Sequence, residues 1–210
     1  MDFQPVKASD KEIIDKYMKK ANSRSCDMSF AAVYLWKDFY LLEYTVCEDM
    51  LIFRTTEDGS SYSFPIGDAS PEKALLALEA HCKENEEPLK LHCVYRENEA
   101  WLEEHMPGKF EIEFDRDSAD YIYECEKLIG LKGKKFHGKK NHVNKFIKTY
   151  DWAYEKITDD NINDCLAMLY KWKEINCEPG NIEKHAEACV SENALRERKF
   201  LGLKGGLIRA

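Results

Sequence analysis

The chain has 210 residues, of which 44% are hydrophobic and 33% are charged, and its net charge at pH 7 is −8. This composition is ordinary for a soluble globular protein that is long enough to bury a core. No stretch approaches the ~20 consecutive apolar residues of a membrane-spanning helix, and the N-terminus lacks a signal peptide's apolar core, so the sequence predicts a cytoplasmic location.

The first part of the chain, residues 1–125, is predicted to form one α/β (α+β) module in which helices and strands alternate. Its first helix begins near Ser9, which Glu12 follows three residues later in a capping box. After a short helix, residues 40–46 and 50–55 are expected to pair as a β-hairpin around an acidic turn. The remaining predicted elements are a turn at Asp58-Gly59, a strand over 61–67, a helix over 71–87, a strand over 89–95, a helix over 97–106 and a strand over 110–114.

A second group of elements follows residue 150. It contains a strand over 151–157, a helix over 158–175, a helix over 181–200 and a strand over 204–210. A strand needs a hydrogen-bonded neighbour, and nothing follows the last one. We therefore expect a truncated second module in which Leu166, Leu169 and Trp172 lack part of their cover. Alternatively, the terminal strand pairs with an earlier one. The predicted division is a first module (1–125), a linking segment (126–150) and a partial second module (151–210).

Eight cysteines raise the question of disulfides or a metal site, but their spacing indicates neither. No CxxC pair occurs, and the two His-Cys doublets lack the ligand spacing of structural zinc. We expect reduced thiols, several of them small core residues, and no metal or other cofactor. The cysteines are Cys26, Cys47, Cys82, Cys93, Cys125, Cys165, Cys177 and Cys189.

Positive charge is concentrated from Lys127 to Tyr150, here called the lysine segment. It has eight lysines and no acidic residue, whereas the rest of the chain has 23 basic against 39 acidic side chains, a net charge of −16. A molecule polarised in this way should attract an anionic partner through the lysine segment.

The glycines of the lysine segment, at positions 130, 133 and 138, predict a loop that leads into a helix from about Lys139 to Thr149. Apolar residues spaced along this helix predict a buried stripe of Val143, Phe146, Ile147 and Tyr150. A glycine-rich backbone, a helix N-terminus and mobile ammonium groups together suit phosphate. The candidate binding residues are Lys134, Lys135, Lys139, Lys140, Asn141, Asn144 and Lys145. The alternative is a solvated lysine-rich helix, since no Walker loop is present.

Several motifs of the chain match one known family. The run over 115–150 has an aspartate-tyrosine stretch at 120–123, a leucine-glycine-lysine element and a basic-asparagine helix. Its matching residues are Leu131, Gly133, Lys134, Lys135, Lys139, Lys140, Asn141, Asn144, Lys145 and Phe146. This run resembles the C-terminal domain of phosphatidylglycerol lysyltransferases. Residues 29–40 and 63–67 also look like this family, so the resemblance covers nearly the whole chain.

The resemblance implies a pair of GNAT-type acyltransferase folds around a tunnel, each with a mixed sheet flanked by helices. It also implies transfer of an amino acid from aminoacyl-tRNA to phosphatidylglycerol or another acceptor. Family members commonly carry a membrane-embedded N-terminal part that is absent here, so any membrane association is expected to be peripheral. Much of their substrate pocket lies beyond the point where this chain ends, and no catalytic residue is assigned.

Two other functions stay open. One is an acyl-CoA-dependent GNAT-type transferase, although the usual pyrophosphate loop is not clear in the sequence. The other is a non-catalytic module that binds nucleic acid or anionic lipid through the lysine segment, whose aromatic residues permit base stacking. The sequence has no serine elbow and no cysteine-histidine signature. An aminoacyl ester is already activated, so its transfer needs no covalent nucleophile.

Overall fold

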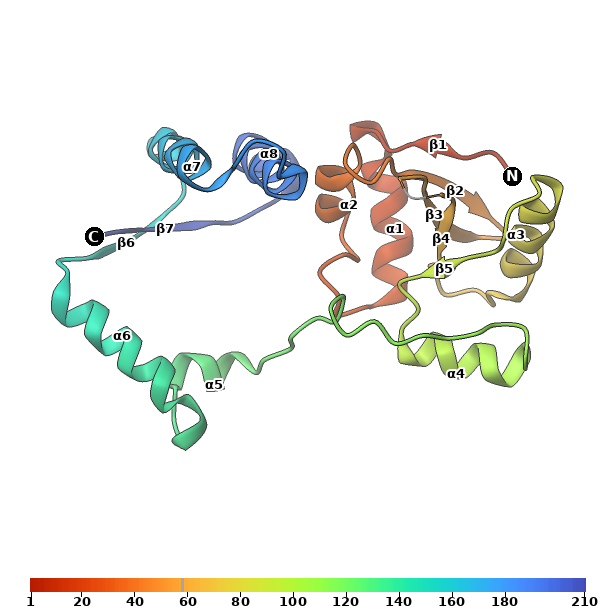
Figure 1. Ribbon diagram of the computed structural model, residues 1–210, viewed down its shortest axis with the longest axis horizontal. Helices are drawn as coiled ribbons and strands as arrows, with labels where there is room; N and C mark the ends of the chain where they lie inside the picture. Colours follow the sequence, from red (N-terminus) through yellow and green to blue (C-terminus); the bar gives the residue numbers. More distant parts are fainter. Residues whose placement is uncertain (58) are drawn as a thin grey trace. The chain divides into compact units, whose positions relative to one another are not determined.

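The computed structural model describes residues 1–57 and 59–210, which form two compact units, Met1–Arg116 and Asp117–Ala210 (Figure 1). Both units contain helices and strands, which confirms the α+β class. The predicted turn at Asp58-Gly59 falls on a residue, 58, that lies outside the described residues. Among the described residues, no helix is long and apolar enough to cross a bilayer.

The first unit is built on a mixed five-stranded sheet in the order β1-β2-β3-β4-β5. Neighbouring strands are antiparallel except β4 and β5, which are parallel. The predicted hairpin is β2–β3, and its two turn residues, Glu48 and Asp49, have φ of 52° and 57°. Two left-handed residues in a two-residue turn match the twist of the flanking strands. The strands are β1 (Gln4–Pro5), β2 (Glu43–Cys47), β3 (Met50–Thr55), β4 (Ser61–Ser63) and β5 (Leu91–His92).

Helices of the first unit lie on both sides of this sheet, with α1 and α3 on opposite sides (Figure 1). This explains the apolar run over residues 50–53 of β3, because the part of a strand that is covered on both faces buries successive side chains. The first helix starts as a 3-10 turn, η1, rather than with the predicted capping box at Ser9. The elements are η1 (Ala8–Asp10), α1 (Lys11–Ala21), α2 (Phe30–Trp36), α3 (Glu72–Glu84) and α4 (Arg96–His105).

The core of the first unit depends on α3. Its residues Ala74, Leu78 and Cys82 are spaced four apart, lie on one face and pack against Met50, Ile52 and Tyr62 of the sheet. Leu75 points to a second cluster with Phe64, Leu102 and Met106, which joins α4 to the same helix. One amphipathic helix thus connects the sheet to α4.

The predicted strand over 110–114 is absent from the described chain, and the strand predicted over 89–95 shortens to Leu91–His92. In the first case the sequence alternates as a half-buried strand should, yet Ile112 and Phe114 are 41% and 74% exposed. Alternation shows which side chains share a face, but a strand forms only where a partner's backbone groups are within reach.

The second unit contains the whole lysine segment and a helical pair. The predicted terminal strand, β7, pairs antiparallel with β6, an earlier strand, as the alternative interpretation expected. Of the residues expected to lack cover, Leu166 and Leu169 are buried and Trp172 is partly buried. The elements are α5 (Cys125–Gly130), η2 (Lys134–Phe136), α6 (His137–Thr149), β6 (Ala153–Lys156), α7 (Ile162–Asn176), α8 (Ile182–Arg196), α9 (Arg198–Leu201) and β7 (Gly206–Arg209).

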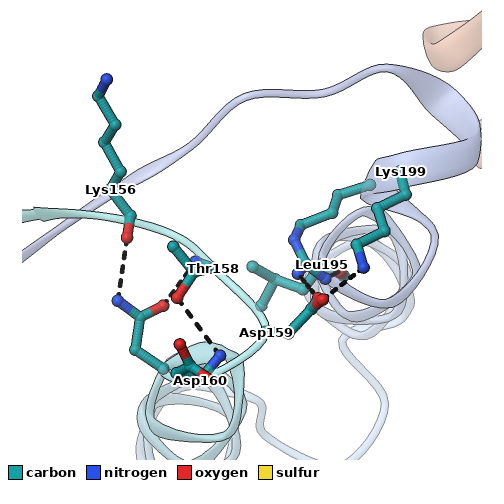
Figure 2. A network of polar contacts seen from close by, with 8 residues as sticks. Lys156, Thr158, Asp159, Asp160, Leu195 and Lys199 are labelled. Carbon is teal, nitrogen blue, oxygen red and sulfur yellow. Dashed lines mark hydrogen bonds and ion pairs between the residues drawn. The ribbon is translucent and has the colours of Figure 1, made fainter.

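Polar contacts hold the β6–α7 turn of the second unit (Figure 2). Asp159 forms ion pairs with Arg198 and Lys199 of α9, and these pairs lower the pKa of its carboxyl group. Beside it, Asn161 accepts a hydrogen bond from the Thr158 N–H at 2.8 Å and donates one to the Lys156 carbonyl at 2.9 Å. The turn is therefore fixed by side chains at both its strand end and its helix end.

The central position of α3 predicts an uneven cost of substitution along that helix. Leu78 is fully buried, so Leu78→Ala should lower the free energy of unfolding by ~2–5 kcal/mol through lost burial and a residual cavity. Leu76, 46% exposed on the same helix, is the matched control, and Leu76→Ala should cost about 0.5 kcal/mol or less. Urea unfolding followed by circular dichroism measures both. Similar costs for the two variants would contradict this packing.

His92 should make the first unit sensitive to acid. Burial, assisted by Lys90, lowers the pKa of His92 from 6.5 to about 4, and its Nδ1 lies 2.8 Å from the Ser61 hydroxyl oxygen. Because the unfolded state binds more protons between these two values, stability should fall as the pH drops from 6.5 towards 4. His92→Asn should reduce that fall, measured as the free energy of unfolding at about pH 7 and about pH 4.5. An unchanged pH dependence in the variant would refute the assignment.

Candidate polyanion-binding site

The lysine segment folds as two helices joined by a sharp turn. Leu131 ends α5 with a left-handed φ of 43°, and Gly133 starts η2 with φ of 91°. The predicted helix is α6, which begins at His137 and ends at Thr149. The predicted loop is more ordered than expected, because α5 and η2 occupy much of it. Gly130 is the last residue of α5 and Gly133 precedes the first residue of η2, so these glycines mark helix ends and do not prevent helices from forming.

The buried stripe predicted on α6 is wrong. Val143, Ile147 and Tyr150 are 45%, 47% and 51% exposed, and only Phe146 is partly buried. The Phe146 ring lies 5.1 Å from the Tyr150 ring and 6.3 Å from the Trp152 ring, measured between centroids. Helical spacing placed these side chains on one face correctly, but spacing does not determine whether another element covers that face.

All but one of the lysines of the segment lack an acidic partner in the described structure. Lys127 pairs with Glu124 at 2.7 Å, but from Lys132 to Lys148 no lysine forms an ion pair within the part of the chain that the structure describes. All seven predicted binding residues are exposed: Lys134, Lys135, Lys139, Lys140, Asn141, Asn144 and Lys145. Their charge is therefore turned to solvent without local compensation, as an anion-binding surface requires.

The turn and the start of α6 enclose a depression of about 360 Å³, here called the lysine depression. It is lined by Leu131, Lys132, Gly133, Lys134, His137 and Lys140. It brings together two of the predicted binding residues, Lys134 and Lys140, and leaves the other five outside its lining. Two lining residues, Lys132 and His137, were not among the predicted ones. Their spacing was the usable signal, since Lys132 and Lys134 flank a glycine and His137 precedes Lys140 by about one helical turn.

One side-chain contact orients the histidine of the lysine depression. The Asn141 amide nitrogen lies 3.4 Å from His137 Nδ1 and can donate to it. In the neutral imidazole the proton is then on Nε2, which is left as a donor. The polar side chains of the lining are the ammonium groups of three lysines and the imidazole of His137, which can bind an oxyanion. Elsewhere in the described residues, no group of three or more His, Cys, Asp or Glu side chains is placed to hold a metal ion.

Comparison with family models places the chain in one family, and two individual proteins are similar to it. Residues 18–210 match the family described as "Phosphatidylglycerol lysyltransferase, C-terminal". A crystal structure of a conserved protein of unknown function from Bacteroides thetaiotaomicron is similar at 31% identity and a TM-score of 0.90, over 100% of this chain and 72% of that chain. An uncharacterized protein of Mycoplasmoides gallisepticum is 33% identical over 63 residues, which are 29% of this chain and 20% of that protein. The chain thus aligns with about a fifth of that curated relative's length.

The turn that shapes the depression should depend on Gly133. A side chain at its left-handed φ of 91° is strained even though no atom lies within 4 Å of the added Cβ, so Gly133→Ala should cost about 1–2 kcal/mol. Gly138, inside α6 and equally uncrowded, is the matched control. Gly138→Ala should stabilise the helix by ~0.5–1 kcal/mol. Urea unfolding gives both values, and a destabilisation of equal size in the two variants would contradict the backbone assignment.

Proposed function

Since the chain belongs to the family of phosphatidylglycerol lysyltransferase C-terminal domains, we propose that it acts in transferring an amino acid from aminoacyl-tRNA to an acceptor. The acceptor class is an anionic phospholipid, phosphatidylglycerol or a related hydroxyl compound. The proposal includes a pair of GNAT-type folds, cytoplasmic localisation and peripheral association with the membrane. It also keeps the division into residues 1–125, 126–150 and 151–210.

The chemistry of such a transfer is modest. An acceptor hydroxyl oxygen attacks the carbonyl carbon of the aminoacyl ester and forms a new ester bond. The bond to the tRNA ribose oxygen breaks, and that oxygen takes up the proton that the acceptor loses. The protein must position both substrates, assist the proton transfer and stabilise the oxyanion. A large part of this task is to hold two phosphate-bearing molecules.

The observation that carries the proposal is the uncompensated charge of the lysine segment. Seven lysines from Lys132 to Lys148 are free of ion pairs in the described structure, on a chain whose net charge is −8. Positive charge on one segment of an acidic protein steers an anion to that segment and repels it elsewhere. Aminoacyl-tRNA and an anionic phospholipid both present phosphates, so one surface suits donor binding and contact with the membrane.

Lysine replacement should change how tRNA binding depends on salt. Lys134, Lys135, Lys139 and Lys140 would contact about four phosphates, and each contact releases counterions. Changing all four to Ala should make the slope of log affinity against log salt shallower by roughly 3 units. Folding should change little, because exposed charges contribute ~0–1 kcal/mol each. Fluorescence titrations of tRNA at several salt concentrations measure the slope.

A matched control removes the same charge from the first unit. Lys19, Lys73, Lys83 and Lys90 are exposed there, and their replacement by Ala should leave the tRNA slope nearly unchanged. Equal slopes for the wild type and the variant of the lysine segment would leave that segment as a solvated helix. Binding of coenzyme A to the protein, together with no binding of tRNA, would favour the acyl-CoA-dependent alternative.

A further inference from the structure

We propose that the lysine depression is a discrete site for one phosphate group. Its ligating side chains are Lys132, Lys134, His137 and Lys140. The inference rests on the proposed function, because it locates one phosphate within the surface that binds a polyanion. It goes further because it distinguishes the lysines that contact this anion from those that only add to the positive electrostatic potential around it.

The backbone brings these side chains together. The chain reverses between the left-handed Leu131 and the left-handed Gly133, so the lysine between them and the one after Gly133 line the same hollow. Phe136, two residues after Lys134, is only 9% exposed, so its buried ring anchors the turn. From there α6 begins at once, and residues 137 and 140 lie one helical turn apart on the wall of the depression. The arrangement thus follows from two backbone conformations and one buried ring.

The donors in the lysine depression suit a tetrahedral oxyanion. Three ammonium groups offer rotatable N–H donors, and no carboxylate belongs to the lining. The His137 ring adds a directed donor at Nε2, because its Nδ1 faces the Asn141 amide nitrogen at 3.4 Å. Hydrogen bonds from charged donors to phosphate oxygens are about twice as strong as neutral ones.

The size of the depression is compatible with a small ligand. Its volume of about 360 Å³ is at the lower end of the ~300–1,000 Å³ that small-molecule sites occupy. A phosphate ester group with its immediate substituents fits this scale, and its charge matches the surrounding ammonium groups. A phosphate ester thus suits both the size and the charge of the depression. It is a diester if the source is the RNA backbone or a glycerophospholipid headgroup, and a monoester if the source is a terminal phosphate.

Two pairs of lysines distinguish a discrete site from a diffuse field. Lys132 and Lys140 line the depression, one on the turn and one on α6. Lys135 and Lys139 lie equally close in sequence, one on η2 and one on α6, and are not part of the lining. Both pairs are exposed, so replacing either pair by Ala removes two positive charges from the same segment at little cost in stability.

The test is a titration of the full chain with dimethyl phosphate and with methyl phosphate, followed by amide chemical shifts in two-dimensional NMR. In the wild type, the largest shifts should occur at Gly133, Lys134 and His137. K132A/K140A should weaken affinity for the preferred ester by ~tenfold or more, and K135A/K139A by about threefold or less. Circular dichroism of both variants shows whether they keep the wild-type fold. Preference for the diester assigns the site to a backbone or headgroup phosphate, and preference for the monoester assigns it to a terminal phosphate.

Equal weakening by the two double variants would overturn the discrete site, as would a wild type whose shifts are scattered or absent. The tRNA salt slope separates this failure from failure of the proposed function. If phosphate esters do not bind locally while the slope still depends on the lysine segment, only the discrete site is lost. If phosphate esters bind in the depression but the salt slope of tRNA binding does not depend on the lysines, the proposal of polyanion binding is refuted and the proposal of a phosphate site is retained.

Discussion

Repulsion among like charges is the constraint on which the second unit is built. The segment from Lys127 to Tyr150 contains eight lysines and no acidic residue, so it cannot stabilise itself through internal ion pairs. It is held instead by backbone hydrogen bonds of α5, η2 and α6 and by a few apolar anchors, of which Phe136 is the buried one. Such a segment must stay on the surface, because buried ammonium groups without partners would be very costly. Its exposure and its affinity for anions therefore have one cause.

The two units are stabilised by different means. In the first, a sheet covered on both faces buries two connected apolar clusters, and α3 belongs to both of them. In the second, fewer apolar side chains are buried, and polar contacts join the elements. Arg209 of β7 binds Glu155 of β6 and Asp164 of α7, while Tyr170 of α7 donates a hydrogen bond to Glu192 of α8 at 2.7 Å. Exposed ion pairs add little free energy each, so these contacts fix geometry more than they supply stability.

Sequence reasoning succeeded where the determining contacts are local. The β2–β3 hairpin, α3 and the extent of α6 follow from turn residues and periodicity within one segment. It failed for the segment over 110–114, where a distant partner decides the outcome. It also left the partner of β7 open, because that partner begins about fifty residues earlier. The lysines were easy to find, but their convergence depends on a leucine in a left-handed conformation. No propensity favours that conformation for Leu131, so the spacing of Lys132 and His137 could suggest these residues but could not show that they line one depression.

The pairing pattern of the first sheet also has a consequence for the order in which the unit folds. In β2–β3 the strands meet across a two-residue turn, whereas β4 pairs with β5 only after α3 has been crossed, and β1 pairs with β2 across some forty residues. Closing a longer loop costs more chain entropy before any contact repays it. The hairpin is thus the natural nucleus, and β1 is the last strand to join. A nascent chain would therefore expose its N-terminal strand until residues as far along as Tyr44 have been synthesised and paired.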